Sequence, residues 1–398
     1  MQNLSRLLNP QSIAVIGGGA WCNSIVLAAR QIGFEGILRP IHPSGKTIAG
    51  ITSLTSLEEF SGPIDAAFIG INRHATLDIV AQLRSLGAGG AICFASGFSE
   101  AVVEDATGSN LQTQLIAAAD NMPILGPNCY GFLNAFDGCG IWPDQHGCRK
   151  IERGVAILTQ SSNIAINLTM QNRGLPIGYV ITCGNQAQTS QSDVGLYVLE
   201  DPRVSAIGLH VEGFGDLRGW ETLARKAHDK NIPLIALKSG KTEQAQAAAV
   251  SHTASLSGSD AGAQALLERL GIRRAHSLPV FLEALKLSHQ FGQLTSNRIA
   301  SISCSGGEAA LTADTAHTTK LTFPPLNSRQ RTGLSTALGP MVALANPLDY
   351  HTYIWRNEAL MAQAWAAMAD PDIALTLLIS DYPRADICDP SDWDCVTN

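Results

Sequence analysis

Short apolar runs alternate with amphipathic stretches along this chain, and that alternation restricts its fold more than any other feature. The first run, Ser12–Gly17, is rich in β-branched residues and ends in glycine, as buried parallel strands do. Further strand-like runs lie at 37–41, 66–71, 90–95 and 123–126, with helical stretches such as 75–86 and 111–120 between them. Strands that alternate with helices form a doubly wound parallel sheet, so we predict an α/β fold.

The same alternation starts again twice further along the chain. Strand-like runs at 154–159, 177–182, 205–211 and 233–238 predict a second parallel sheet, which is flavodoxin-like by its strand count. A third series opens at 298–308 and has a further strand at 373–380. With 398 residues there is room for two or three domains. We predict a Rossmann-like domain at 1–138, a flavodoxin-like domain at 150–294 and an incomplete third α/β domain at 296–398.

Composition excludes several classes of protein. Hydrophobic residues make up 45% of the chain and charged residues 15%, which indicates a globular protein with a large core. The formal net charge of −7 argues against a general nucleic-acid binder. Nine cysteines without a CxxC pair indicate reduced thiols, and we expect no metal site. We find no signal peptide and no bilayer-spanning run, and therefore predict a cytoplasmic protein with no membrane partner.

A glycine turn, Gly17-Gly18-Gly19, follows the first strand. Such a turn lets a ligand phosphate approach the backbone at a helix N-terminus. The further glycine of the dinucleotide fingerprint is absent, and the second strand leads into Pro43-Ser44-Gly45-Lys46 instead of an acidic residue. A nicotinamide cofactor is therefore disfavoured, whereas a phosphate-bearing ligand is compatible with the turn, and a purely structural turn is an alternative.

Two further loops lie at predicted strand ends, where ligands bind in such sheets. They are Ala95–Glu100 and Gly126–Gly131, and the second holds an Asn amide and a thiol between Pro and Gly. On local grounds, a rigid interdomain turn explains the second loop equally well.

These segments resemble the NDP-forming acyl-CoA synthetase superfamily, which includes the succinyl-CoA synthetase α subunit. The matching motifs are SIAVIGGG, PIHPSGKTIAG, CFASGFSE and GPNCYGFLN. The resemblance implies that the first domain binds coenzyme A, with Cys129 a neighbour of its thiol rather than a nucleophile. The family usually has a later glycine where this chain has Asn23-Ser24. The coenzyme A-binding residues that it implies are Gly17, Gly18, Gly19, Ser24, Pro43, Lys46, Ser96, Gly97, Asn128 and Cys129.

Two predicted helix starts could hold a phosphoryl group. Gln160-Ser161-Ser162-Asn163 follows a strand in the middle domain, and Ser305-Gly306-Gly307 repeats the arrangement in the third. Serine at such a position caps the helix, and the exposed amides of the first turn attract anions. Both roles can hold at once, and we predict that these seven residues bind phosphate or acyl phosphate.

A histidine, His252, lies among small hydroxyl residues in the segment SHTASLSGSD. Alone, this segment is typical of a solvated loop, but imidazole can also be a reversible nucleophile. The resemblance continues here through AILTQSSN, TCGNQAQ, LEDPRVSAIGLHVEG and LKSGKTEQAQAAAVSHTASLSGSD. It implies that His252 carries a phosphoryl group and that Glu212 orients its imidazole. The family usually has glycine after the Gln-Ser, where this chain has Ser162-Asn163.

The resemblance implies an acid–thiol ligase that makes an acyl-CoA from a small carboxylic acid, coenzyme A and ATP through acyl-phosphate and phosphohistidine intermediates. We find no ATP-grasp segment, so ATP/ADP and Mg²⁺ would bind outside this chain, on another domain or a partner subunit of a homo- or hetero-oligomer. The alternative is a non-catalytic acyl-CoA-binding regulatory module, which would need neither His252 nor Glu212. A nicotinamide-dependent dehydrogenase is disfavoured by the incomplete glycine pattern.

Overall fold

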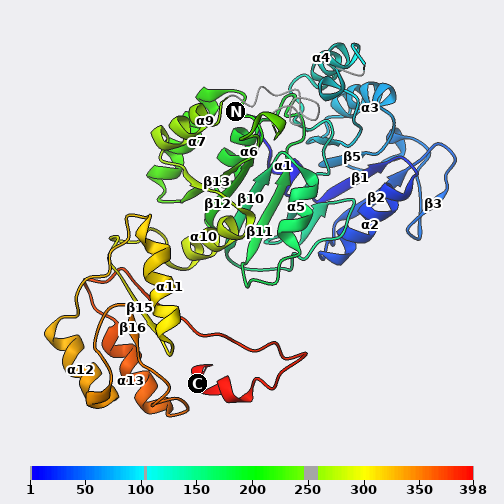
Figure 1. Ribbon diagram of the computed structural model, residues 1–398. Helices are drawn as coiled ribbons and strands as arrows, with labels where there is room; N and C mark the ends of the chain where they lie inside the picture. The colour runs from blue at the N-terminus through cyan, green and yellow to red at the C-terminus, as the bar shows by residue number, and fades with distance from the viewer. Residues whose placement is uncertain (1, 103–104, 246–258, 398) are drawn as a thin grey trace. The chain divides into compact units, whose positions relative to one another are not determined.

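The computed structural model describes residues 2–102, 105–245 and 259–397. These residues form two compact units, Met1–Gly292 and Gln293–Asn398, and each is described by itself (Figure 1). Among the described residues, we find no helix with the length and apolar character needed to span a bilayer. All nine cysteines are free thiols.

The first sheet is parallel, which confirms the doubly wound α/β prediction for this part of the chain. Its five strands, in spatial order, are β2 (Ile37–Ile41), β1 (Ser12–Ile16), β5 (Ala66–Ile69), β6 (Ala91–Cys93) and β7 (Ile124–Leu125). Helices α1 (Ser5–Leu8) and α2 (Ala20–Gln31) pack with Ile13 and Val15 on one face. Helices α3 (Arg73–Ser85) and α4 (Gly108–Ala119) pack with Ala14 and Ile16 on the other. Alternate residues of β1 therefore face different helices, so the strand is apolar throughout. A two-stranded hairpin, β3 (Thr47–Ile48) and β4 (Ile51–Thr52), follows β2.

The second sheet has seven strands and is mixed rather than wholly parallel. Its spatial order is β14 (Arg273–Ala275), β13 (Leu234–Lys238), β12 (Val204–Val211), β10 (Gly154–Thr159), β11 (Ile177–Thr182), β8 (Phe132–Asn134) and β9 (Cys139–Ile141). The first five are parallel, as the sequence predicted for four of them, whereas β8 pairs antiparallel with β11 and β9 with β8. β8 and β9 were not predicted, because their short segments lie in a stretch, 132–141, whose apolar pattern Asn134, Asp137 and two glycines interrupt.

Helices cover both faces of this second sheet. Val155 and Ile157 of β10 pack with α5 (Ser162–Thr169) and α10 (Leu278–Phe291). Leu158 packs on the opposite face with α6 (Gln191–Val198), α7 (Leu217–Asp229) and α9 (Asp260–Arg269). This is the three-layer arrangement expected of an α/β domain.

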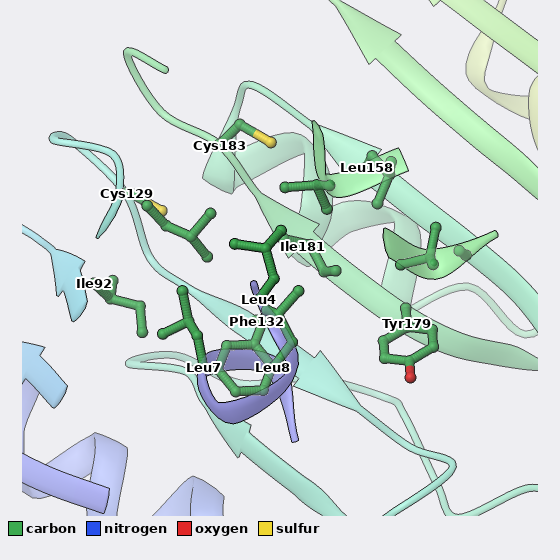
Figure 2. Packing of buried hydrophobic residues seen from close by; sticks show 14 of the residues in the cluster. Leu4, Leu7, Leu8, Ile92, Cys129, Phe132, Leu158, Tyr179, Ile181 and Cys183 are labelled. Carbon is green, nitrogen blue, oxygen red and sulfur yellow. The ribbon is translucent and has the colours of Figure 1, made fainter. Parts of the chain in front are cut away.

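One hydrophobic cluster joins the two sheets of the first unit. Figure 2 shows Leu4, which precedes α1, together with Leu7 and Leu8 of that helix beside Phe132 of β8. Ile181 of β11 belongs to the same cluster. The Asn134 Nδ2 group donates to the carbonyl oxygen of Leu8 at 3.2 Å, which fixes the end of α1 against β8. The predicted boundary at residue 138 therefore falls between β8 and β9, the two hairpin strands at one edge of the second sheet. The division of this unit into two domains is still a prediction.

Strand-end turns from the two sheets also contact each other directly. Thr182 Oγ1 donates to the carbonyl oxygen of Gly131 at 2.9 Å and accepts the Gly131 N–H at 2.9 Å. The Asn185 N–H donates to the Pro127 carbonyl oxygen at 3.0 Å, and the Ala187 N–H donates to that of Gly126 at 3.0 Å. The Gly126–Gly131 turn thus has a defined backbone position against the end of β11.

The second unit is built on a three-stranded parallel sheet in the order β16 (Leu348–Asp349), β15 (Ile299–Ser303), β17 (Leu375–Leu378). Its main core lies between this sheet and two packed helices, α12 (Ser328–Leu338) and α13 (Glu358–Met368). Helix α11 (Gly306–His317) follows β15, close to the predicted 309–317. A short helix, α14 (Asp394–Thr397), is the last described element.

We expect Gly184→Ala to destabilise the first unit strongly. Gly184 has φ +53°, and a Cβ there would lie 2.2 Å from the Pro127 carbonyl oxygen and 2.6 Å from that of Asn128. Both neighbours are backbone atoms that cannot move aside without displacing the turn. The expected loss in the free energy of unfolding is about 3 kcal/mol or more, measured by denaturant titration.

Gly271→Ala is the matched control, because Gly271 has φ +67° with no atom within 4 Å of the added Cβ. It should cost only the left-handed backbone penalty of about 1 kcal/mol. Equal losses for the two variants would contradict the contact described for Gly184.

Candidate functional site

The glycine turn after β1 combines an open helix start with a cation. The Lys46 Nζ group donates to the carbonyl oxygen of Gly18 at 2.5 Å. Gly19 is the N-cap residue of α2, no side chain caps this helix, and no atom lies within 4 Å of a Cβ added at Gly19. Free backbone N–H groups beside a lysine form a suitable binding site for a phosphate, and the assignment of this phosphate to coenzyme A is still a prediction.

The other residues that we predicted at this turn differ in accessibility. Pro43 is exposed, Ser24 is half-buried one turn into α2, and Gly17 is buried with its N–H bonded to the Ile41 carbonyl oxygen at 3.1 Å. Gly17 therefore shapes the turn, whereas Gly19 and Lys46 present the accessible groups.

The buried carboxylate of Glu100 fixes the loop after β6 by accepting hydrogen bonds from its backbone. Glu100 Oε1 accepts the Gly97 N–H at 2.6 Å, and Oε2 accepts the Phe98 N–H at 3.2 Å and a hydrogen bond from Asn185 Nδ2. Ser96 is exposed beside Gly97. Glu100 and Asn185 were not predicted as site residues, although both lie in motifs that sequence analysis had singled out. They join the Ser96–Gly97 loop to the loop that follows β11.

Asn128 and Cys129 face different surroundings within their turn. Asn128 is exposed with φ +55°, whereas Cys129 is fully buried. The Cys129 thiol donates to the Thr182 carbonyl oxygen at 3.1 Å, and burial raises its pKa to about 11. It is therefore a neutral packing group near neutral pH, which agrees with its interpretation as a non-nucleophile. Its predicted proximity to the coenzyme A thiol is still a prediction.

An aromatic cluster that we did not predict lies beside these turns. It consists of Trp21 in the first turn of α2, Phe94 after β6, and Tyr130 in the Gly126–Gly131 turn. The ring centroids are 5.3 Å apart for Trp21–Phe94, 5.6 Å for Phe94–Tyr130 and 6.0 Å for Trp21–Tyr130. The sequence feature that could have predicted this cluster is the presence of an aromatic residue in each of three segments that follow strands.

Gln160 holds the backbone that carries Glu212. Its Oε1 atom accepts the N–H groups of Glu212 at 2.8 Å and Gly213 at 2.9 Å, and its Nε2 donates to the Gly213 carbonyl oxygen at 2.6 Å. The Gln160 amide is buried and engaged in these bonds. The accessible groups at this strand end therefore belong to 161–163, and Gln160 positions Glu212.

A buried lysine reaches the same backbone from β13. Lys238 Nζ donates to the Glu212 carbonyl oxygen at 2.9 Å and to the carbonyl oxygen of Ser239, and burial lowers the pKa of Lys238. Glu212 is half-buried at the carboxyl end of β12. The segment 246–258, which includes His252, lies outside the described residues.

The start of α5 links the two sheets. Ser161 Oγ caps the helix by accepting the Ile164 N–H at 3.4 Å, and Ser162 Oγ accepts the Tyr130 N–H at 3.3 Å. Asn163 is exposed. The structure thus brings the predicted phosphate-binding helix start directly against the Gly126–Gly131 turn.

The start of α11 in the second unit has the same strand-end hydrogen bond as the start of α5. Ser303 Oγ donates to the Ser305 carbonyl oxygen at 3.1 Å, as Thr159 Oγ1 donates to that of Ser161 at 3.0 Å. Gly306 and Gly307 are exposed, and no side chain caps this helix. Among the described residues, no group of three or more His, Cys, Asp or Glu side chains could hold a metal ion.

A buried histidine supports the first of these turns. The hydroxyl of Thr159 forms a hydrogen bond with His210 Nδ1 at 3.0 Å, and Gln191 Nε2 donates to the His210 carbonyl oxygen at 3.0 Å. Burial, together with the nearby Lys238 ammonium, lowers the pKa of His210 to about 4. The imidazole is therefore neutral near pH 7.

Comparisons with known proteins confirm the resemblance found in the sequence. A CoA-binding domain model matches residues 11–135, and a model of the succinyl-CoA ligase-like flavodoxin domain matches residues 152–288. The α subunit of an ADP-forming acetate–CoA ligase II from Pyrococcus furiosus is 28% identical, over 96% of this chain and 83% of that subunit. A trans-feruloyl-CoA synthase from an unknown prokaryote is 29% identical over 87% of this chain, which spans only 50% of that protein.

A solved structure shows the same fold. It is a dinucleotide-forming acetyl-coenzyme A synthetase 1 from Ca. Korarchaeum cryptofilum in complex with phosphate and ADP. It aligns with a TM-score of 0.84 at 23% identity, over 96% of this chain and 83% of that chain. At this identity the match supports the fold, which agrees with the predicted Rossmann-like and flavodoxin-like domains.

We expect the first unit to lose stability as the pH falls from 6.5 toward 4. His210 binds a proton near pH 6.5 when unfolded but only near pH 4 when folded, so the unfolded state takes up more protons between these values. The free energy of unfolding should fall by up to about 3 kcal/mol from this group. Denaturant titrations at pH 7 and pH 4.5 would measure the difference.

His210→Gln should reduce this pH dependence, whereas His74→Gln, at an exposed position, should leave it unchanged. An unaltered pH dependence in His210→Gln would contradict a neutral buried imidazole.

Proposed function

We propose that this chain, which carries the CoA-binding and succinyl-CoA ligase-like domains of the NDP-forming acyl-CoA synthetase superfamily, is the coenzyme A-binding and phosphohistidine portion of an ADP-forming acid–thiol ligase. The contact between the Tyr130 N–H and Ser162 Oγ, at 3.3 Å, carries the proposal. It joins the turn predicted to lie near the thiol of coenzyme A to the helix start predicted to hold acyl phosphate. Thioester formation requires these two groups to meet.

The reaction has three displacement steps. An imidazole nitrogen of His252 takes the γ-phosphoryl group of ATP and ADP leaves. A carboxylate oxygen of the acid then takes the phosphoryl group from His252, giving an acyl phosphate and free histidine. Finally, the coenzyme A thiolate attacks the acyl carbonyl carbon, and inorganic phosphate leaves with the bonding electrons.

The residues of this chain orient and stabilise these groups. The carboxylate of Glu212, with its backbone held by Gln160 and Lys238, orients the His252 imidazole. In the first unit, the amides of 161–163 offset the negative charge of a phosphoryl group that binds there. The uncapped start of α11 at 305–307 offers the second unit a separate binding site of the same kind. Lys46 and the start of α2 bind the phosphates of coenzyme A.

The nucleotide and its Mg²⁺ belong to a part of the enzyme that this chain does not supply. The chain spans about half the length of the first two curated relatives, and 83% of the Pyrococcus furiosus subunit α. We propose that an ATP-grasp domain or a partner subunit provides the nucleotide site. The names of the relatives include feruloyl, acetate and 4-hydroxybutyrate, so they do not identify the acid.

A phosphorylation assay tests this function. Labelled inorganic phosphate and a panel of acyl-CoAs should give the protein a label that is acid-labile and base-stable. His252→Ala should abolish the label, because the acceptor nitrogen is gone. Glu212→Gln should lower the labelling rate about 10- to 100-fold, as expected for loss of an orienting carboxylate.

Coenzyme A binding without label, with every acyl-CoA and also with an ATP-grasp partner present, would instead support the regulatory module. Label that persists in His252→Ala would show that another residue is the phosphoryl carrier.

We expect Lys46→Ala to weaken coenzyme A binding about fivefold, as measured by isothermal titration calorimetry. The exposed ammonium loses only a screened phosphate contact, worth about 1 kcal/mol. Lys150→Ala removes an exposed lysine elsewhere in this unit and should leave the dissociation constant unchanged. Equal affinities for Lys46→Ala and Lys150→Ala would exclude Lys46 from the phosphate site.

A further inference from the structure

The ligase function proposed above does not identify the carboxylic acid substrate. The aromatic cluster of Trp21, Phe94 and Tyr130 indicates which class of acid the enzyme uses. Resting on that function, we propose that this cluster binds a planar aromatic acyl group, so that the enzyme favours aromatic acids over short aliphatic ones. The cluster is then a specificity surface for the acid.

The three rings come from separate segments that meet at the carboxyl edge of the first sheet. Trp21 follows β1, Phe94 follows β6, and Tyr130 lies in the turn that follows β7. Their centroid separations of 5.3 to 6.0 Å and interplanar angles of 38° to 52° are those of a mutually packed set. Ligands bind at this edge of a parallel sheet, so the cluster lies where a substrate arrives.

Two buried rings hold the cluster in place from the protein interior. Phe68 contacts Phe94 at a centroid distance of 5.4 Å, and Trp142 meets Tyr130 edge-on at 5.8 Å. Phe68 and Trp142 are fully buried. This backing fixes the positions of Phe94 and Tyr130 before any ligand binds, which lowers the entropic cost of binding.

The opposite side of the cluster is accessible. Trp21 is 44% exposed, whereas Phe94 and Tyr130 are half-buried. Among the described residues, the Tyr130 hydroxyl has no hydrogen-bond partner. Burial and the nearby Asp144 raise the pKa of Tyr130, which keeps the hydroxyl a donor. An apolar surface with one free polar group suits a flat ring that carries a polar substituent.

The position of Tyr130 favours the acyl group as the source of that ring. Its N–H bonds Ser162 Oγ at 3.3 Å, so the cluster borders the helix start where we propose the acyl phosphate forms. A carboxyl group bound there places an attached ring within reach of Tyr130. A methyl group in the same position gains no ring stacking. The adenine of coenzyme A is the other source of a flat ring, and the experiment separates the two.

The test compares dissociation constants of coenzyme A, acetyl-CoA, benzoyl-CoA and 4′-phosphopantetheine for the unaltered protein and for Trp21→Ala. We expect benzoyl-CoA to bind about tenfold more tightly than acetyl-CoA, and this preference to fall to within twofold in Trp21→Ala. Trp21→Phe retains a ring and should restore most of the preference. Phe291→Ala, at a 56% exposed aromatic residue of α10, is the matched control and should change nothing.

Three results would overturn the assignment. The first is no preference for benzoyl-CoA, and the second is a preference that Trp21→Ala leaves intact. The third is equal weakening of coenzyme A and both acyl-CoAs in Trp21→Ala with 4′-phosphopantetheine unchanged, because the ring would then be the adenine. If the unaltered protein does not bind coenzyme A at all, the proposed ligase function is refuted. The coenzyme A titration therefore separates failure of the function from failure of the acid assignment.

Discussion

The hydrogen bonds between Thr182 and Gly131 are the contact on which the first unit depends. A single hydroxyl both donates to the Gly131 carbonyl oxygen and accepts the Gly131 N–H, and both atoms are buried. These bonds anchor the Gly126–Gly131 turn, whose neighbouring strand, β8, pairs with β11. A buried pair of this kind is costly to leave unsatisfied, so the turn cannot shift without loss of stability.

Several contacts of the proposed site extend from that anchored turn. Its Tyr130 N–H meets Ser162, and its Pro127 carbonyl oxygen accepts the N–H of Asn185. Asn185 in turn holds Glu100, which positions the Gly97 loop. The loops of both sheets are therefore linked through polar contacts, while the hydrophobic cluster around Leu7 and Phe132 keeps the sheets together beneath them.

The sequence was sufficient to predict the strands that have a clear apolar pattern. β2, β10 and β11 have the predicted bounds, and β1 ends one residue before the predicted glycine. β1, β10 and β11 are largely apolar runs, which is the signal that predicts a buried strand. The strands β8 and β9 lie in a stretch that polar residues and glycines interrupt, so no apolar run marks them, and their antiparallel pairing is a tertiary property. Among the predicted site residues, Lys46 lies against Gly18 of the glycine turn, and both belong to motifs that the sequence contains. The aromatic cluster and the clamp that Gln160 forms on Glu212 depend on contacts between distant segments, which no local pattern encodes.

The matching hydrogen bonds at the ends of β10 and β15 have a further consequence. In each, a strand-end hydroxyl holds the carbonyl oxygen two residues later, in Ser161 and in Ser305. The peptide dipoles of both turns are thus fixed by the protein itself, whether or not an anion is present. A phosphoryl group that arrives at either turn meets dipoles that are already oriented, and stabilising its charge requires little reorganisation of the backbone.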